Sequence, residues 1–371
     1  MEVALGLLAA IAGFLALALL HYAFWTRRLR QPIRDDGIVR APTADGWRLA
    51  LGIRLPREAE RLPPVLLVHG LSANRWMLDA GVETFSLGAY LARRGFRTFA
   101  LDLRGHGDSR DAPKRGKPWC FDDYVRTDVP AALDAVRRAT GEDQVLWVGH
   151  SLGGVTGLVA CQLYPERIAA IAAIAAPLSF DEDGLVARYI RWGFLVDGRV
   201  NRYLARMIAP FGGVLHPVAA ELAINGRNVD RPVYQRILSN SIENVPGRVF
   251  DQMTDWVKND ACRSMDRSVD YRAGLSACRV PALFVSAVRD YLAPPTVVRT
   301  AYDLWGGPKE LVEFSTATGY SADYGHVDLL LGKRAPLEVY PVVSRWLEAH
   351  SRAVVRGEAR SGARTRAEGV A

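Results

Sequence analysis

The pentapeptide Gly149-His150-Ser151-Leu152-Gly153 matches the pattern G-x-S-x-G, which carries a nucleophilic serine where the local structure is right. The preceding residues, Gln144–Val148, are typical of a buried strand, and Leu152–Tyr164 is typical of an apolar helix. Between a strand and a helix, the pattern forms a strained turn that raises the serine above the sheet. Glycines are required because backbone comes too close there for side chains. We therefore expect Gly149, His150 and Gly153 to form the turn and Ser151 to be a nucleophile.

A serine hydroxyl is a poor nucleophile until a base removes its proton, so a histidine is required. His326 lies in a loop after the last predicted strand, Glu310–Phe314, from which its side chain can reach back over the sheet edge. We expect His326 to be the general base. A solvent-exposed loop histidine is the alternative, and Asp328 could cap the following helix. The other histidines have different expected places: His69, His106 and His150 in glycine turns with backbone roles, His21 at the membrane end, His216 in a helical insertion, and His350 at the end of the last helix.

A third group must hold the imidazole in one tautomer and offset its positive charge. Asp290 closely follows the predicted strand Pro281–Ala287, so it should emerge at the carboxyl edge of a parallel sheet, where ligand sites form. Asp102 follows another predicted strand, Phe96–Leu101, and is the competing acid, although Arg104 nearby favours a structural loop. We predict Asp290 as the acid.

The negative charge that develops on an attacked carbonyl oxygen needs two hydrogen-bond donors. The N–H of Leu152, directly after the nucleophile and at the start of a helix, is one expected donor. The N–H of Leu71, which follows His69-Gly70 at the end of a predicted strand, is the expected second donor. Losing one such donor typically costs roughly 3 kcal/mol of transition-state stabilisation.

Predicted strands and helices alternate along most of the chain, which predicts βαβ units and a mostly parallel sheet. Gly46–Pro56 alternates polar and apolar residues as an edge strand does, and Leu337–His350 is typical of a closing helix. The alternation stops between residues 178 and 277, where proline-interrupted helices are expected. That insertion carries an apolar stripe, most of which we expect to pack on the core: Tyr189, Trp192, Phe194, Leu195, Tyr203, Leu204, Met207, Ile208 and Phe211.

The N-terminus has the composition of a membrane-spanning helix. Every residue from Val3 to Leu20 is apolar or glycine, and roughly 20 such residues span a bilayer. Aromatic residues and then Arg27 and Arg28 follow, as at a membrane interface. A cleaved signal peptide is the alternative, but it normally carries basic residues where this chain has Met1-Glu2. We predict a retained single-pass anchor, with the catalytic domain in the cytoplasm because the arginines lie on that side.

The composition excludes several other classes of protein. Hydrophobic residues make up 49% of the 371 residues and charged residues 23%, which is ordinary for a protein with a sizeable core. The formal charge is +7, but many arginines lie near the two ends, so we expect no nucleic-acid partner. The four cysteines lack C-x-x-C spacing, so neither a metal site nor a disulfide framework is expected. No feature indicates a cofactor, and the sequence does not determine the oligomeric state.

The motifs and their order resemble the α/β-hydrolase superfamily over residues 38–350. The resemblance rests on His69-Gly70, on Asp102–Ser109, on the serine turn and on the order Ser151, Asp290, His326. It implies an α/β fold with a mostly parallel central sheet flanked by helices and a helical cap. The expected division is an anchor at 1–26, a core in two parts at 38–177 and 278–352, a cap at 178–277, and a disordered basic tail at 353–371.

One branch of the superfamily is especially similar. Tyr324–Leu330 and Asp270–Leu275 resemble the matching regions of acid lipases and polyhydroxyalkanoate synthases. The synthases carry cysteine at the turn, so Ser151 favours hydrolysis. Ala287 is a departure, because many relatives have glycine three residues before the acid.

A large aromatic cap on a membrane-tethered chain would exclude water and receive an acyl chain. We therefore expect a lipase or carboxylesterase that cleaves lipophilic carboxylic esters through an acyl-enzyme. A thioesterase or an acyltransferase would use the same three residues, and a peptidase has no supporting feature. A non-catalytic binding protein on the same fold is the alternative from a different class.

Overall fold

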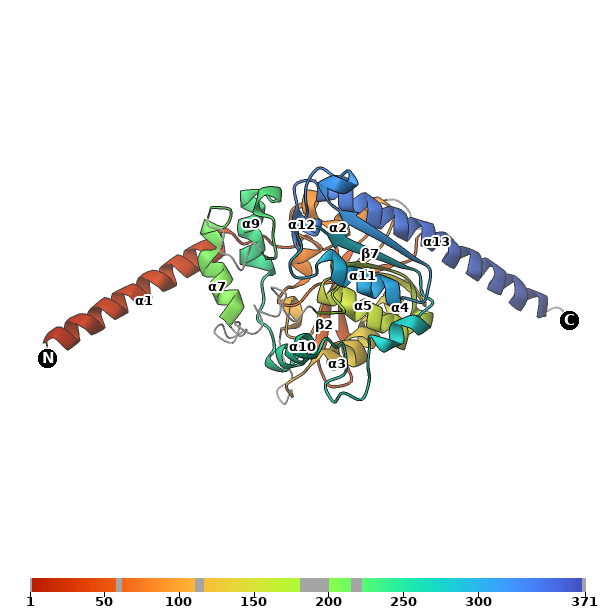
Figure 1. The fold of residues 1–371 in the computed structure, drawn as a ribbon, viewed down its shortest axis with the longest axis horizontal. Coiled ribbons are helices and arrows are strands. Elements are labelled where there is room, and N and C mark those ends of the chain that lie inside the picture. Colours follow the sequence, from red (N-terminus) through yellow and green to blue (C-terminus); the bar gives the residue numbers. More distant parts are fainter. Residues whose placement is uncertain (1, 58–61, 111–116, 181–199, 215–221, 369–371) are drawn as a thin grey trace.

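The computed structural model describes residues 2–57, 62–110, 117–180, 200–214 and 222–368. A central sheet with helices on both faces forms the main body, and two long helices leave it in opposite directions (Figure 1). Of the apolar stripe expected in the insertion, Tyr189, Trp192, Phe194 and Leu195 lie outside the described residues, as does His216.

The sheet has eight strands in the order β1-β2-β4-β3-β5-β6-β7-β8. β1 pairs antiparallel with β2, and β2 with β4, whereas all other neighbours run parallel, so the predicted mostly parallel sheet is confirmed. The strands are β1 (Gly37–Pro42), β2 (Arg48–Arg54), β3 (Val65–Val68), β4 (Thr98–Asp102), β5 (Val145–His150), β6 (Ile168–Ile174), β7 (Ala282–Ala287) and β8 (Lys309–Phe314).

One strand prediction is wrong in its position. The sequence predicts Gly46–Pro56 at the sheet edge, but β1 pairs along its outer side over residues 37–42. The half-buried alternation of β1 is short and ends in Pro42, and a residue that cannot donate to the ladder is tolerated at such an edge.

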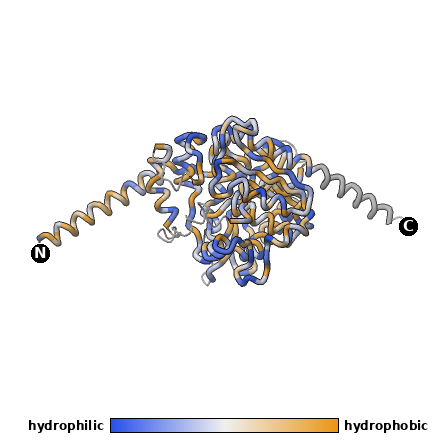
Figure 2. Tube along the Cα trace, in the orientation of Figure 1, coloured by the Kyte–Doolittle hydropathy of each residue, from blue (hydrophilic) through white to orange (hydrophobic). Residues whose placement is uncertain are grey.

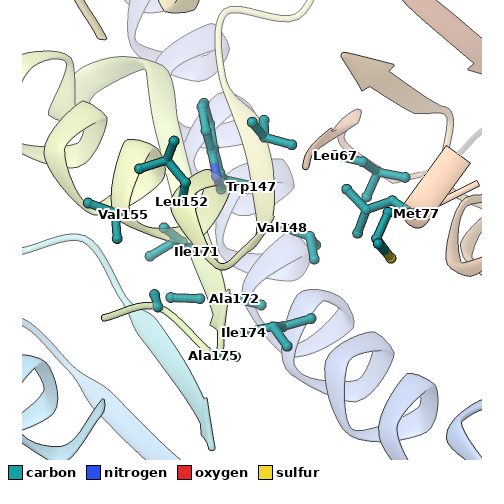
Figure 3. Packing of buried hydrophobic residues seen from close by; sticks show 14 of the residues in the cluster. Leu67, Met77, Trp147, Val148, Leu152, Val155, Ile171, Ala172, Ile174 and Ala175 are labelled. Carbon is teal, nitrogen blue, oxygen red and sulfur yellow. The ribbon is translucent and has the colours of Figure 1, made fainter. Parts of the chain in front are cut away.

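Helices α4 (Val129–Thr140), α5 (Leu152–Leu163) and α11 (Pro295–Leu304) cover one face of the sheet, and α2 (Leu87–Arg93) and α13 (Ala335–Glu368) cover the other. The core beneath α5 contains Trp147, whose indole lies beside Leu152, Val155 and Ile171 (Figure 3). The Trp147 Nε1–H donates to Gly153 O at 3.1 Å, so the core ties directly to the first turn of α5. The floor beneath the serine turn is therefore rigid.

The insertion between β6 and β7 is helical where it is described. It contains α7 (Asn201–Ile208), α9 (Arg231–Arg236) and α10 (Gly247–Asn259), with the short helix α3 (Phe121–Asp123) against α10. In Figure 1, α7 and α9 lie between the inner end of α1 and the sheet. The expectation that most of the apolar stripe packs on the core is wrong for most of its described members. Met207 is partly buried, but four others are exposed: Tyr203, Leu204, Ile208 and Phe211.

The two helices that leave the body differ in character. α1 (Glu2–Arg28) is long and apolar enough to cross a membrane, and none of its residues is buried against the body. Figure 2 shows hydrophobic residues along nearly all of its length. α13 continues to Glu368, which differs from the disordered tail predicted from residue 353. That segment is rich in Ala, Arg and Glu, which are strong helix formers, and it continues a helix that packing has already nucleated.

Candidate active site

Ser151 lies in a sharp turn between β5 and α5. Its backbone has φ 54° and ψ −123°, a conformation that non-glycine residues rarely adopt and that costs on the order of 1–3 kcal/mol. Hydrogen bonds hold it there: Ser151 N donates to Ile174 O at 2.8 Å, and Ser151 O accepts from Gly154 N at 2.8 Å and Val155 N at 3.0 Å. The side chain caps no helix, so its hydroxyl is available for chemistry.

The glycines of the turn are sterically required. A Cβ added at Gly149 would lie 2.2 Å from Gly153 O, and one at Gly153 would lie 2.2 Å from Val68 O. A Cβ at Gly70 would lie 2.9 Å from Ser151 Cβ. The loop after β3 therefore lies directly against the serine, which places the backbone before Leu71 beside it.

The structure brings His326 and Asp290 together. His326 Nδ1 and Asp290 Oδ2 are 2.7 Å apart, and both side chains are buried. The other carboxylate oxygen, Oδ1, accepts from Leu292 N at 2.8 Å and Ala293 N at 2.7 Å. These bonds fix the carboxylate, whose oxygens are acceptors, so His326 Nδ1 is placed to donate its hydrogen to Asp290.

His150 links the histidine loop to the serine turn. Its Nε2 and His326 O are 3.0 Å apart, and the two imidazole rings have centroids separated by 4.6 Å. Because His150 immediately precedes Ser151, this bond places the histidine loop beside the serine. The three candidate residues thus gather at the carboxyl edge of the sheet, at the ends of β5, β7 and β8.

Asp102, the competing acid, lies in a structural network. Its carboxylate accepts from Arg75 N at 2.8 Å, Arg75 Nε at 3.0 Å and Asp108 N at 2.8 Å. The neighbouring Arg104 takes part in a separate bond, to Asp128 at 2.7 Å. No histidine bonds to Asp102 among its described partners, so its carboxylate organises a loop.

Asp328 fastens the histidine loop to the insertion rather than only starting α12 (Asp328–Leu331). Its buried carboxylate accepts from Gly325 N at 2.9 Å, Asn225 N at 3.1 Å and Asn228 Nδ2 at 2.8 Å. Burial raises the pKa of Asp328. Sequence reasoning weighed only a helix cap here, since partners about a hundred residues away leave no local signal.

Replacing Asp328 with asparagine should therefore lower both stability and activity. The amide group would face one of three donors, and a buried unsatisfied donor costs about 1–3 kcal/mol. Thermal unfolding and kcat measured on a soluble ester check this, and the exposed Asp303→Asn is the control. An Asp328→Asn variant as stable as the control would contradict the assigned role.

The loop that carries Leu71 is clamped by the insertion. Ser72, with φ 54°, donates its hydroxyl to Glu243 O, and Glu243 N donates to Ser72 O at 2.8 Å. Asn74 Nδ2 donates to Asn240 O at 2.9 Å and to Glu243 Oε1 at 3.0 Å. No local sequence pattern marks this clamp, because its partners are 166–171 positions apart in the chain.

Three buried histidines have backbone roles, as their glycine turns predict. His69 Nδ1 is 2.8 Å from Gly70 O, and its Nε2 accepts from Leu103 N at 3.1 Å. His106 Nδ1 is 2.9 Å from Arg104 O. Burial lowers the pKa of His69 to about 3 and also lowers the pKa values of His106 and His150, so these rings stay neutral.

Acidification is therefore expected to remove the stability that these three histidines contribute, whereas the half-buried Asp35 and the buried Asp102 and Asp128, whose pKa values are raised to about 6, act in the opposite direction. An unfolded histidine has a pKa of about 6.5, so below that pH the unfolded chain binds protons that the folded chain does not. The histidine contribution is complete above pH 6.5 and is lost as the pH falls towards 3, at up to about 1.4 kcal/mol per pH unit for each ring. Urea unfolding between pH 7 and about pH 5 measures the slope. Acidification should be less destabilising to His69→Asn than to the parent protein, and an unchanged slope would refute this explanation.

A polar cavity of about 540 Å³ lies between the exit of α1 and the Leu71 loop. Its lining includes Gln31, Arg75, Asp102, Asn240 and Glu243, and none of the three candidate catalytic residues. Arg75 bonds to Asp102 and Glu243 bonds to Asn74, another lining residue, so this polar cavity belongs to the clamp rather than to an acyl-chain pocket. Within the described ranges, no group of three or more His, Cys, Asp or Glu side chains is arranged to hold a metal ion.

Comparisons with known proteins agree with this architecture. Residues 63–318 match a family model described as the alpha/beta hydrolase fold. The chain is 24% identical over 340 residues to human lipase member M, covering 80% of this chain and 79% of that lipase. It is 23% identical over 314 residues to the poly(3-hydroxyalkanoate) polymerase subunit PhaC of Haloferax mediterranei, covering 78% of this chain but only 59% of that subunit.

A solved structure of a membrane phospholipase A superposes with a TM-score of 0.57 at 17% identity, covering 94% of this chain and 97% of that one. The resemblance to the acid lipase and polyhydroxyalkanoate synthase branch is therefore confirmed at the level of family and fold. The family model spans well over half of the chain and includes the serine turn and Asp290. The chain belongs to the α/β-hydrolase fold family.

Proposed function

We propose that this protein is a membrane-anchored serine hydrolase that cleaves lipophilic carboxylic esters through an acyl-enzyme. Ser151 is the nucleophile, His326 the general base and Asp290 the acid that orients it. The observation that carries the proposal is the buried 2.7 Å contact between His326 and Asp290 beside a serine held at φ 54°. Among the relatives, a human lipase supports the ester class.

The proposed reaction follows from the hydrogen bonds that the three side chains can make. As Ser151 Oγ attacks the acyl carbon, His326 Nε2 takes the hydroxyl proton, and Asp290 stabilises the resulting imidazolium through Nδ1. The carbonyl oxygen becomes an oxyanion and accepts hydrogen bonds from the N–H groups of Leu71 and Leu152. The imidazolium then protonates the alkoxide leaving group, which departs as an alcohol. Water, deprotonated by the same imidazole, hydrolyses the acyl-enzyme and regenerates Ser151.

Membrane anchoring is the second part of the proposal. Outside its inner end, which contacts α7, α1 exposes its apolar side chains to the surroundings, which is unfavourable in water and favourable in lipid. Arg27 and Arg28 at its end support a cytoplasmic position for the catalytic domain. A fold neighbour that is itself a membrane phospholipase A supports a lipophilic substrate.

A fluorophosphonate probe tests the nucleophile on the full-length protein. Labelling that maps to Ser151 and is lost after heat denaturation is expected. Absence of labelling on the native protein would instead favour a non-catalytic binding protein. A series of p-nitrophenyl esters then tests the substrate class: kcat/KM should rise with acyl-chain length, and cleavage of acetate alone would exclude the lipophilic preference.

A further inference from the structure

The outer side of α7 exposes an apolar stripe. Leu204 and Ile208 of α7, together with Phe211 at the end of the short 3-10 helix Ala209–Phe211 that follows it, are 47%, 41% and 46% exposed, and we call these three residues the α7 stripe. The spacing of four residues places Leu204 and Ile208 on one side of α7. Ala205 of α7 and Ala209, the residue that follows the helix, are buried against the body. A contiguous apolar surface of this kind on a helix marks a site of contact with an apolar partner.

α7 packs against the inner end of α1 (Figure 1). His21 Nε2 is 3.0 Å from Met207 O, and the His21 ring stacks on Phe211 with centroids 6.0 Å apart and planes inclined by 10°. Tyr22 lies against Tyr203 with ring centroids 6.2 Å apart. α7 is therefore level with the first residues after the apolar run of α1.

The position of α7 along α1 determines the depth of the stripe in the bilayer. A helix rises about 1.5 Å per residue, so if the apolar run ends at Leu20, residues 21 and 22 lie at the boundary between acyl chains and headgroups. The two arginines of α7 are bonded within the protein: Arg206 Nε donates to Ser239 O at 3.1 Å and its Nη1 to Tyr22 OH at 3.4 Å. Arg202 Nη1 lies 3.5 Å from Glu243 Oε2, and its Nη2 donates to Tyr203 OH at 3.0 Å. An amphipathic helix that exposes apolar side chains on one side and keeps its polar side chains on the other lies in the membrane interface.

We propose that the α7 stripe, Leu204, Ile208 and Phe211, inserts into the interfacial layer of the bilayer that α1 spans. The inference rests on the proposed anchoring by α1, and it commits to lipid as the partner of this surface. Arg202 reaches Glu243, which clamps Ser72 beside the Leu71 loop, so the helix that contacts lipid is bonded to the segment that holds the active-site loop. An ester would then enter the site from the bilayer.

Site-specific fluorescence on the full-length protein in phosphatidylcholine nanodiscs tests the contact. The four native cysteines are buried, so Leu204→Cys and Ile208→Cys can each carry one environment-sensitive NBD label. Leu15→Cys in α1 reports insertion of the anchor. Leu304→Cys is the matched soluble control, because Leu304 is 41% exposed at the far end of α11. A doxyl-labelled phosphatidylcholine should quench the labels at 15, 204 and 208, but not at 304.

The outcomes separate the two proposals. Quenching at 15 with residues 204 and 208 behaving like 304 would overturn the inference and leave the anchor intact. No quenching at 15 would refute the anchor itself. The labels at 204 and 208 could instead become protected from water as the protein concentration rises, without quenching by lipid. That result would assign the stripe to contact with a second copy of the chain and would also overturn the inference.

A kinetic test uses the same surface without labels. The double substitution Leu204→Ser and Ile208→Ser should lower kcat/KM for an ester embedded in the bilayer by about tenfold. It should leave the rate on a soluble short-chain ester unchanged, since neither residue touches the reacting groups. Equal losses on both substrates would show a general structural defect and contradict lipid contact.

Discussion

Replacing Ser151 with alanine is expected to abolish ester hydrolysis, with kcat falling by about 10⁶-fold. The loss should be this large because the proposed acyl-enzyme forms on the Ser151 oxygen, and the half-buried site offers no second hydroxyl in the same turn. Steady-state hydrolysis of a soluble p-nitrophenyl ester measures the effect, and fluorophosphonate labelling should disappear with it.

The exposed serine Ser276 is the matched control, because Ser276→Ala removes the same hydroxyl from a surface position. Its activity should equal that of the parent. The Ser151→Ala variant should keep its melting temperature, since the turn is held by backbone bonds that alanine preserves. A Ser151→Ala protein that still hydrolyses esters at more than about a thousandth of the parent rate would refute the nucleophile assignment.

Replacing Asp290 with asparagine is expected to lower kcat by about 10⁴-fold without unfolding the protein. Oδ1 accepts two backbone N–H groups, from Leu292 and Ala293, so the asparagine carbonyl oxygen will take that place. Its NH₂ group must then face His326 Nδ1, which can only accept. The imidazole proton moves to Nε2, and the ring can no longer take the proton of Ser151.

Hydrolysis of the soluble ester and the rate of fluorophosphonate labelling both report this change, and thermal unfolding shows whether the fold persists. Asp102→Asn is the control for a buried aspartate at the carboxyl end of a strand. It should lose stability through its Arg75 and Asp108 bonds, while the folded fraction keeps activity within about tenfold. The reverse pattern, an inactive Asp102→Asn with an active Asp290→Asn, would reassign the acid.

Much of the candidate site can be predicted from the sequence because its parts are locally encoded. The turn at Ser151 depends on glycines within two residues of it, so a short motif contains the whole steric requirement. Asp290 and His326 each follow a predicted strand, and the carboxyl ends of parallel strands meet at one edge. This rule predicts that Asp290 and His326 lie close together in the fold although they are far from Ser151 in the chain.

Long-range partners are what sequence reasoning could not find. Ser72 and Glu243 exchange hydrogen bonds across 171 positions, and no local pattern marks either residue. The arginine that binds Asp102 is likewise not a sequence neighbour, because Arg75 comes from the loop after β3. Charged partners in a packed interior are chosen by the distance between atoms and not by the distance along the chain.

The α7 stripe shows the limit of periodicity. Leu204, Ile208 and Phe211 repeat as a core-facing helix would, yet they face outwards because the small residues Ala205 and Ala209 pack on the body instead. By itself the sequence determined the parallel sheet, the serine turn, the order of the three candidate catalytic residues and the apolar N-terminal run. Only the tertiary structure decided which face of α7 is buried, which acid meets the histidine and how the insertion holds the Leu71 loop. The reason is that hydrophobic patterns specify which residues avoid water, whereas packing specifies what they contact.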